Sequence, residues 1–258
     1  LDFNHMSMQR VGGQQGRLWV DNNYHAMHHV YPHSFFSSFA NVFDLVAGTN
    51  CQIKGRHFLV TGASGAFGSA MVAKLQKLGG VVETAKSGID FSAGNYAAMR
   101  EKLDRADVLV LAHGAKEHDC WNANFVTFRD LTELFTEVGA SRLAPPEVWA
   151  LGSEVELHGD MGMAELKAYS ASKRAFALFA RHYFRSDALI YRHIVPSSFT
   201  SAMGKGAMSA KTAVNIAMFL IRRGFRYVPV TLTGLALINY FRFRFFQKGQ
   251  PDLSQPAG

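Results

Sequence analysis

Cysteine is scarce in this chain of 258 residues, and its two cysteines, Cys51 and Cys120, show no paired spacing. This scarcity argues against a disulfide scaffold and against a metal site built on thiolates, and it fits a reducing compartment. Long apolar runs are also missing, since none reaches the ~20 residues that a membrane-spanning helix needs. No signal peptide is visible, and the first residue is leucine. We therefore expect the chain to be a piece of a longer protein.

Acidic residues are too few to balance the basic ones. The chain has 27 lysines and arginines against 20 aspartates and glutamates, a formal net charge of +7. Such an excess favours a phosphorylated cofactor, an anionic membrane surface or nucleic acid. No recognised nucleic-acid motif accompanies the charge, so we expect no nucleic-acid partner. Hydrophobic residues make up 48% of the chain, enough for the core of one α/β domain with appendages.

A strand, a glycine-rich turn and a helix follow one another from residue 56. The apolar run Phe58 to Val60 predicts a buried strand, and SAMVAKLQKLGG predicts an amphipathic helix. Glycines let the backbone turn tightly and approach a pyrophosphate, while the helix start offers free N–H groups. The sequence therefore predicts a nucleotide site whose turn contacts the cofactor through Gly62, Ser64, Gly65, Phe67 and Gly68.

Further strands are predicted at 80–86, 107–114, 147–153 and 189–196, with a short strand at 89–91 before a crossover helix. A helix is expected over 124–138, and Pro229 marks a last, edge strand because it cannot donate a ladder hydrogen bond. The pattern predicts an α/β fold, a Rossmann-type doubly wound parallel sheet in three layers, α/β/α. Ligands bind at the carboxyl ends of such strands, and those ends are Gly62, Lys86, His113, Ser153 and Pro196.

Tyr169 and Lys173 stand four residues apart at the start of the helical run AYSASKRAFALFARHYF, and so share a helix face. A phenol has a pKa near ~10, and a cation one turn away favours its phenolate. The pair therefore suits proton transfer, although many solvated helix faces carry the same two residues. Its position downstream of the glycine turn favours the catalytic interpretation.

The second strand lacks the terminal acid that holds the ribose 2′-hydroxyl in NAD-selective sites. Lys86 and Ser87 stand there instead. A cation and a hydroxyl suit a 2′-phosphate, so we predict NADP(H), with NAD as the alternative if Lys86 is an ordinary surface lysine.

A histidine cluster, His25, His28 and His29, distinguishes residues 1–54, and these rings fall on one face of a helix. Imidazoles that converge in this way bind iron or zinc, while the alternative is a polar, aromatic tail in solvent. HAMHHVYPHSFF resembles the last histidine box of the membrane fatty-acid hydroxylase and sterol desaturase superfamily. Its members bind two irons through several boxes. Only the final box is here, with His5 as a stray partner, so we predict a hydroxylase remnant without a working metal centre and iron only in the intact domain.

Residues 55–232 resemble the short-chain dehydrogenase/reductase family. By this resemblance Tyr169 exchanges a proton with the substrate oxygen, Ser153 positions that oxygen, and Lys173 holds the nicotinamide ribose and supports the phenolate. Together with the glycine turn, the expected cofactor contacts are Lys86, Ser87, His113, Gly114, Tyr169, Lys173 and Ser201. The family's NNAG stretch appears as Ala112 to Ala115, and its helix asparagine aligns with Ala123, whose neighbours Asn122 and Asn124 are candidate substitutes.

The segment 233–258 is apolar and aromatic with basic residues, followed by a loose tail. It is too short to span a bilayer, and it suits either the membrane interface or a cover over a core face or dimer contact. We expect a cytoplasmic chain, peripheral to a membrane or tethered there by a missing N-terminal domain, that forms homo-oligomers.

Two resemblances in one chain are typical of two-part sterol desaturase/short-chain dehydrogenase proteins. The prediction is an NADP(H)-dependent oxidoreductase that acts on a carbonyl or alcohol of a small molecule, which is lipid-like if the partner domain works on lipids. The alternative is a non-catalytic NADP(H)-binding module that steadies or regulates the attached hydroxylase. A third interpretation, an iron-dependent hydroxylase, needs histidine boxes that the sequence lacks.

Overall fold

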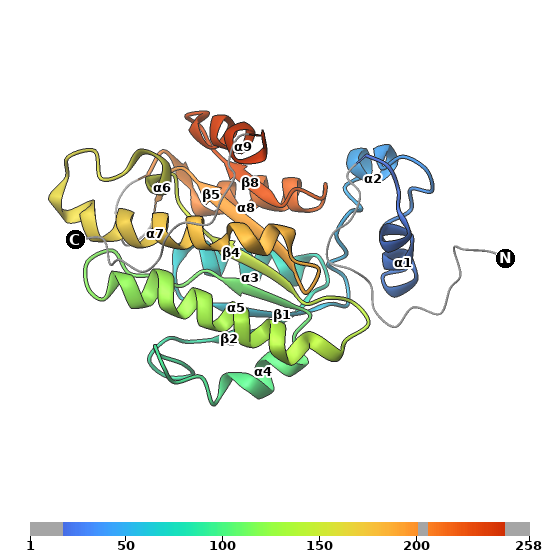
Figure 1. Ribbon diagram of the computed structural model, residues 1–258, viewed down its shortest axis with the longest axis horizontal. Helices are drawn as coiled ribbons and strands as arrows, with labels where there is room; N and C mark the ends of the chain where they lie inside the picture. Colours follow the sequence, from blue (N-terminus) through green and yellow to red (C-terminus); the bar gives the residue numbers. More distant parts are fainter. Residues whose placement is uncertain (1–17, 201–205, 246–258) are drawn as a thin grey trace.

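A parallel sheet of six strands, in the order β2-β1-β3-β4-β5-β8, forms the centre of the molecule (Figure 1). The structure is a computed structural model that describes residues 18–200 and 206–245. The strands are β1 (His57–Thr61), β2 (Val81–Ala85), β3 (Val108–Leu111), β4 (Glu147–Leu151), β5 (Ile190–Pro196) and β8 (Tyr227–Val230). A separate two-stranded ladder joins β6 (Phe199–Thr200) to β7 (Met208–Ser209).

Helices cover both faces of this sheet. One face packs against α3 (Ala66–Lys77) and α8 (Ala210–Ile221), and the other against α4 (Met99–Arg105), α5 (Thr127–Val138) and α7 (Lys167–Phe179). Short helical turns complete the unit: η2 (Asn122–Val126), η3 (Gly139–Ser141), α6 (Val155–His158), η4 (Ala164–Leu166) and η5 (Ala180–Arg185). The predicted three-layer α/β/α fold with a parallel sheet is confirmed.

The inner strands β1, β3 and β4 carry mostly apolar residues because each contributes to two cores. Along β1, Phe58 and Val60 face α3 and α8, whereas Leu59 between them faces the opposite helices. Parallel strands buried in this way lose the alternation of polar and apolar residues, which explains the continuous runs in the sequence. Pro229 lies in the edge strand β8, as predicted, and pairs in register with Val195.

Two local predictions need correction. Residues 89–91 form no strand: this part of the described chain shows only an isolated bridge between Ser87 and Phe91. The sheet therefore has one strand fewer at the β2 edge, because the chain turns back on itself after Lys86, where Asp90 binds the Lys86 amide. The helix expected over 124–138 begins earlier, with the π-helical turn η2, before α5 continues it.

The described part of the N-terminal segment, residues 18–54, is more ordered than a loose tail. It forms α1 (Asn22–Val30) and α2 (Val42–Ala47), which lie beside the α/β unit (Figure 1). The buried carboxylate of Asp44 joins the two, because it accepts hydrogen bonds from the Tyr24 hydroxyl (2.5 Å) and the Ser37 amide (2.6 Å). Hydrogen bonds at the end of α8 attach the segment: Asn50 N–H donates to the Arg222 carbonyl, and Arg222 Nε to that of Gly48.

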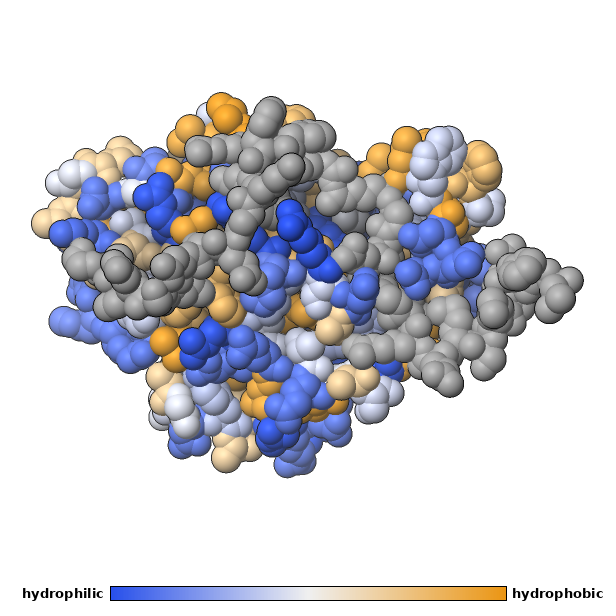
Figure 2. All heavy atoms as spheres, in the orientation of Figure 1, coloured by the Kyte–Doolittle hydropathy of each residue, from blue (hydrophilic) through white to orange (hydrophobic). Residues whose placement is uncertain are grey.

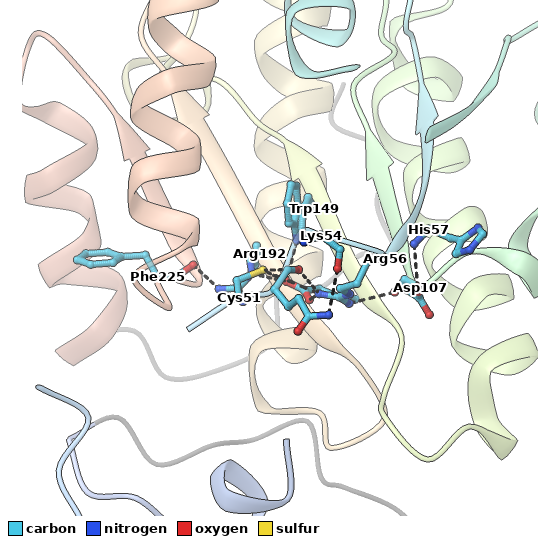
Figure 3. A network of polar contacts seen from close by, with 10 residues as sticks. Cys51, Lys54, Arg56, His57, Asp107, Trp149, Arg192 and Phe225 are labelled. Atoms are coloured by element: carbon cyan, nitrogen blue, oxygen red, sulfur yellow. Dashed lines mark hydrogen bonds and ion pairs between the residues drawn. The ribbon is translucent and has the colours of Figure 1, made fainter. Parts of the chain in front are cut away.

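A buried charge cluster lies at the amino ends of the strands, opposite the predicted site (Figure 3). The carboxylate of Glu147 contacts Arg56 at 2.7 Å and Arg192 at 2.5 Å, and it accepts the indole N–H of Trp149 at 2.8 Å. Burial disfavours the carboxylate form, but the two guanidinium groups outweigh it and hold the pKa of Glu147 at about 2. The Arg56 guanidinium also stacks on the Tyr31 ring, which ties the N-terminal segment to the sheet.

The C-terminal helix α9 (Leu235–Phe245) packs on β8 and α6. Apolar side chains gather over α9 and over α2 in Figure 2, where Ile238 is 68% exposed and Val46 71%. Among the residues that the structure describes, no helix is both long and apolar enough to cross a bilayer.

Candidate active site

The glycine turn after β1 forms one side of the site. Gly62 has a φ of 68°, and a Cβ there would lie 2.4 Å from the His113 amide nitrogen, so only glycine fits between β1 and β3. A Cβ on Gly68 would lie 2.1 Å from the Gly62 carbonyl oxygen, which explains why the first turn of α3 also needs glycine. Gly65 is the N-cap of α3, and both Gly65 and Ser64 are exposed. The turn therefore offers open backbone and a helix N-terminus to an anion.

The side chain of His113 points away from this surface. Its Nδ1 lies 2.7 Å from the Thr61 hydroxyl and its Nε2 lies 2.8 Å from that of Thr127. Burial, and then the charge of Lys173, lower the pKa of His113 to about 3, so the ring is neutral. Contact between this residue and a cofactor would therefore come from its backbone. Gly114, the next residue, is exposed.

Asn124 fastens the loop after β3 to the helix α7. Its amide nitrogen donates to the Ala115 carbonyl (2.7 Å) and to the Ser172 hydroxyl (3.1 Å), and its oxygen accepts the Ala115 N–H (3.3 Å). Asn122 instead binds Asp119 in a contact at the surface. Of the two candidate substitutes for the relay asparagine, Asn124 is therefore the one buried beside the site. Its role in proton transfer stays a prediction.

Helix α7 brings Tyr169 to Ser153, which follows β4. The Ser153 hydroxyl lies close enough to the Tyr169 phenol to lower its pKa, and the Ser153 Oγ accepts the Val155 N–H at 3.3 Å. Lys173 is buried, and its Nζ donates to the Leu151 carbonyl at 2.8 Å and lies 4.7 Å from the centre of the Phe128 ring. A Cβ on Gly114 would lie 3.9 Å from this Nζ, so the lysine also adjoins the loop after β3.

Burial shifts the pKa values of Lys173 and Tyr169 in opposite directions. It lowers the pKa of Lys173 to about 8, an effect that the charge of Glu156 opposes. Burial also raises the pKa of Tyr169, while the hydrogen bond from Ser153 lowers it. The amine thus titrates near neutrality and lies one turn from a phenol with a hydroxyl partner. Such an arrangement can hold and move a proton.

Lys86 and Ser87 lie at the carboxyl end of β2 and are both exposed. The carboxylate of Asp90 lies close by: it accepts the Lys86 N–H at 2.7 Å and pairs with Lys102 at 3.3 Å. Ser201, the remaining predicted cofactor contact, lies outside the described residues.

The histidines of α1 do not assemble a metal site. Nε2 of His25 lies 3.3 Å from Nε2 of His29, and His28 bonds the Ser34 carbonyl at 3.0 Å. Within residues 18–200 and 206–245, no three histidine, cysteine, aspartate or glutamate side chains are grouped to hold a metal ion. His5 lies outside the described residues.

Sequence reasoning missed two polar residues that contact the site from behind, Glu156 and His193. Both are buried, and Glu156 Oε2 accepts the Ser153 N–H at 3.3 Å. The sequence does show a histidine within strand β5 and an acid three residues after Ser153. Neither of these features identifies the other residue as its partner.

Solved structures with this architecture are short-chain dehydrogenases. A short-chain dehydrogenase from Burkholderia cenocepacia J2315 in complex with NADP has a TM-score of 0.58 at 15% identity, covering 76% of this chain and 100% of that one. A short-chain dehydrogenase/reductase from Burkholderia phymatum in complex with NAD has a TM-score of 0.55 at 13% identity, covering 80% and 100%. The fold is that of the short-chain dehydrogenase/reductases.

In sequence, the chain is 26% identical over 257 aligned positions to the monoglucosyldiacylglycerol epimerase of Synechocystis sp.. The match covers 88% of this chain but only 62% of that protein's length. No protein-family model matches the chain.

Proposed function

We propose that this chain is an NADP(H)-dependent oxidoreductase that reduces a carbonyl group or oxidises the corresponding alcohol. The observation that carries the proposal is the meeting of Ser153, Tyr169 and Lys173 at the carboxyl ends of the strands, next to the glycine turn. The exposed Ser64 and Gly65 and the start of α3 fit a dinucleotide, which would supply or take up the hydride.

The chain's own residues would manage the proton. The Tyr169 phenol gives a proton to the substrate oxygen during reduction and takes it back during oxidation. The Ser153 hydroxyl, which lies close to that phenol, would orient the same substrate oxygen. Lys173, held by the Leu151 carbonyl, keeps a positive charge beside the phenol and so favours its phenolate.

The preference for NADP(H) over NAD(H) is attributed to Lys86 and Ser87. Both are exposed at the end of β2, where a cation and a hydroxyl suit a 2′-phosphate. Asp90, whose carboxylate binds the Lys86 amide, is also paired with Lys102, which reduces its ability to repel a phosphate.

The proposed substrate class is a hydroxylated lipid. The support is the relative in Synechocystis, whose name specifies a glycosylated diacylglycerol. Inverting the configuration of a secondary alcohol can proceed through oxidation to a ketone and reduction from the other face. Those two steps regenerate the nicotinamide cofactor, so an epimerase of this kind consumes no net NADPH.

The test is a titration with NADPH and NADH followed by a substrate screen with two readouts. Oxidation of NADPH is followed with fatty aldehydes and sterol ketones, and chromatography of glycosylated diacylglycerols detects a redox-neutral conversion. We expect tighter binding of NADPH than of NADH, and Lys86→Asp should narrow or reverse this preference. Lys54→Asp, a substitution near the amino end of β1, is the control. Equal affinities in the parent chain would contradict the NADP(H) assignment.

The same experiment must distinguish the proposed enzyme from a non-catalytic module that only binds NADP(H). It predicts tight NADPH binding with neither NADPH oxidation nor altered lipid in the screen, and no effect of removing the Tyr169 hydroxyl.

A further inference from the structure

Three side chains without a part in the proposed reaction form a buried chain behind Ser153. Nε2 of His193 lies 3.0 and 3.2 Å from the two carboxylate oxygens of Glu156, and Nδ1 of the same ring lies 2.9 Å from the Tyr191 hydroxyl. Each of these three residues is 5% exposed or less. Buried polar groups persist where their partners satisfy them, and here each finds one.

The hydrogen-bond partners assign the protons in this chain. Glu156 accepts on both oxygens, since Oε2 also takes the Ser153 N–H, so Nε2 of His193 must be the donor. Burial raises the pKa of the Tyr191 phenol well above its ordinary value. Tyr191 therefore stays a phenol as the partner of Nδ1. The ring of His193 is held between this phenol and the carboxylate of Glu156, which orients the carboxylate towards the Ser153 N–H.

Gly152 brings this charge directly against the site. A Cβ there would lie 2.6 Å from His193 Nε2 and 2.7 Å from Glu156 Oε2, so the pair occupies the space that a side chain would need. The two residues beside Gly152 are Ser153 and Leu151, whose carbonyl binds Lys173. One short stretch of backbone thus separates Glu156 from the proposed catalytic groups.

We propose that Glu156 is a positioning residue for the Ser153, Tyr169 and Lys173 site, an assignment that rests on the proposed function. Its carboxylate, oriented by His193 and Tyr191, holds the backbone of Ser153 and places a negative charge opposite the ammonium group of Lys173. The electrostatics agree, because Glu156 raises the pKa values of both Lys173 and Tyr169. Burial favours the neutral form of the Lys173 amine, and the carboxylate of Glu156 opposes this effect by favouring the charged form.

Other charged or titratable groups face Glu156 from several elements. The pair borders a cavity of about 360 Å³ between α7 and α9, to which α9 contributes the uncharged Leu235, Ile238 and Asn239. The surrounding groups are Tyr169, Lys173 and Arg174 on α7, Arg181 on η5, Tyr191 and His193 on β5, and Tyr227 on β8. The test must therefore single out the charge of Glu156.

Glu156→Gln removes the charge and keeps an acceptor for the Ser153 N–H. The phenolate absorbance of Tyr169, taken as the difference from the Tyr169→Phe background, should titrate on the order of one pH unit lower in Glu156→Gln. The profile of turnover against pH should also move to lower pH on both limbs. The negative charge of Glu156 stabilises the protonated forms of both Tyr169 and Lys173, and the variant lacks that charge. The spectroscopic readout needs no substrate.

Glu154→Gln is the matched control. Glu154 is as buried as Glu156 and lies two residues away, but its carboxylate binds Ser197 and Thr233. It should leave the Tyr169 titration unchanged. Glu156→Met is a second variant of similar side-chain length, which removes both the charge and the contact with the Ser153 N–H and should shift the Tyr169 titration in the same direction.

A folded Glu156→Gln protein whose Tyr169 titrates as in the parent would overturn the proposal. If Glu156→Gln does not fold, an unchanged Tyr169 titration in a folded Glu156→Met protein overturns it instead. A parent chain without turnover contradicts the proposed oxidoreductase function alone, because the phenolate titration still decides the role of Glu156.

Discussion

At the scale of single residues, Tyr169 distinguishes catalysis from binding alone. Tyr169→Phe removes the hydroxyl close to Ser153 and leaves the ring in place. Because general acid–base help contributes about 10²- to 10⁴-fold, we expect a loss of that size in turnover, with little change in NADPH affinity. Lys173→Ala should weaken both. The measurements are steady-state rates and cofactor titrations, and parent-like turnover by Tyr169→Phe would exclude the phenol as the proton-transfer group.

His113 predicts an acid sensitivity of the fold. Its pKa of about 3 in the folded protein lies below the ordinary value of 6.5 in the unfolded chain, so only the unfolded chain binds a proton between these values. The stabilisation is complete above pH 6.5 and is lost as the pH falls towards 3, at about 1.4 kcal/mol per pH unit. His113→Gln should flatten this dependence in urea unfolding between pH 7 and 5. His158→Gln, a surface substitution, should retain the parent's slope, and an equal slope in His113→Gln would contradict the argument.

The limits of sequence reasoning are clearest at these residues. Tyr169, Lys173 and the glycine turn were predictable because spacing on one helix, or in one turn, expresses their geometry. The inward orientation of His113 was not, since its partners Thr61 and Thr127 come from different elements. Glu156 and His193 are 37 positions apart, and a contact at that separation leaves no local pattern.

At the scale of elements, the six strands of the sheet could be predicted from the sequence, whereas some of the segments that follow them could not. Apolar runs bounded by glycine identify buried parallel strands, and all six emerged in order. The strand expected at 89–91 is replaced by the turn from Lys86 to Asp90, whose hydrogen bond no apolar pattern announces. Likewise, the π-helical turn before α5 contains Asn124, whose side chain binds the loop after β3 rather than its own helix.

The charge cluster around Glu147 joins β1, β4 and β5 to the N-terminal segment (Figure 3). Glu147→Ala would leave two buried guanidinium groups without a counter-charge, and loss of one partner in a buried pair costs about 3–5 kcal/mol. We expect a loss of that size in the free energy of unfolding, measured with guanidinium chloride. Glu137→Ala breaks an exposed pair with Arg100 at 3.0 Å and should cost about 0.5 kcal/mol or less. Similar values for the two variants would mean that solvent reaches the cluster.

At the scale of the whole molecule, two parts of different origin were expected, and they pack together. The N-terminal segment is fastened to the α/β unit through Arg222, Gly48 and Asn50, and Arg56 stacks on Tyr31. Apolar side chains remain exposed on α2 and α9 (Figure 2). Contact of these surfaces with a membrane stays a prediction, as does the boundary between the parts at residue 54.

Iron binding is the property that would separate an active hydroxylase part from a remnant. The rings of His25 and His29 approach each other to 3.3 Å, and His28 is engaged with the Ser34 carbonyl, whereas a two-iron centre needs several further ligands. We predict well under one iron per purified chain by elemental analysis, and the same content in a His25→Ala/His28→Ala variant. A metal ion that binds the folded chain would add about 2.7 kcal/mol to the free energy of unfolding at 100 times its Kd. Because we predict no iron site, added Fe(II) should leave the melting temperature unchanged. Two irons per chain in the parent, lost in the double variant, would instead establish a metal centre on α1.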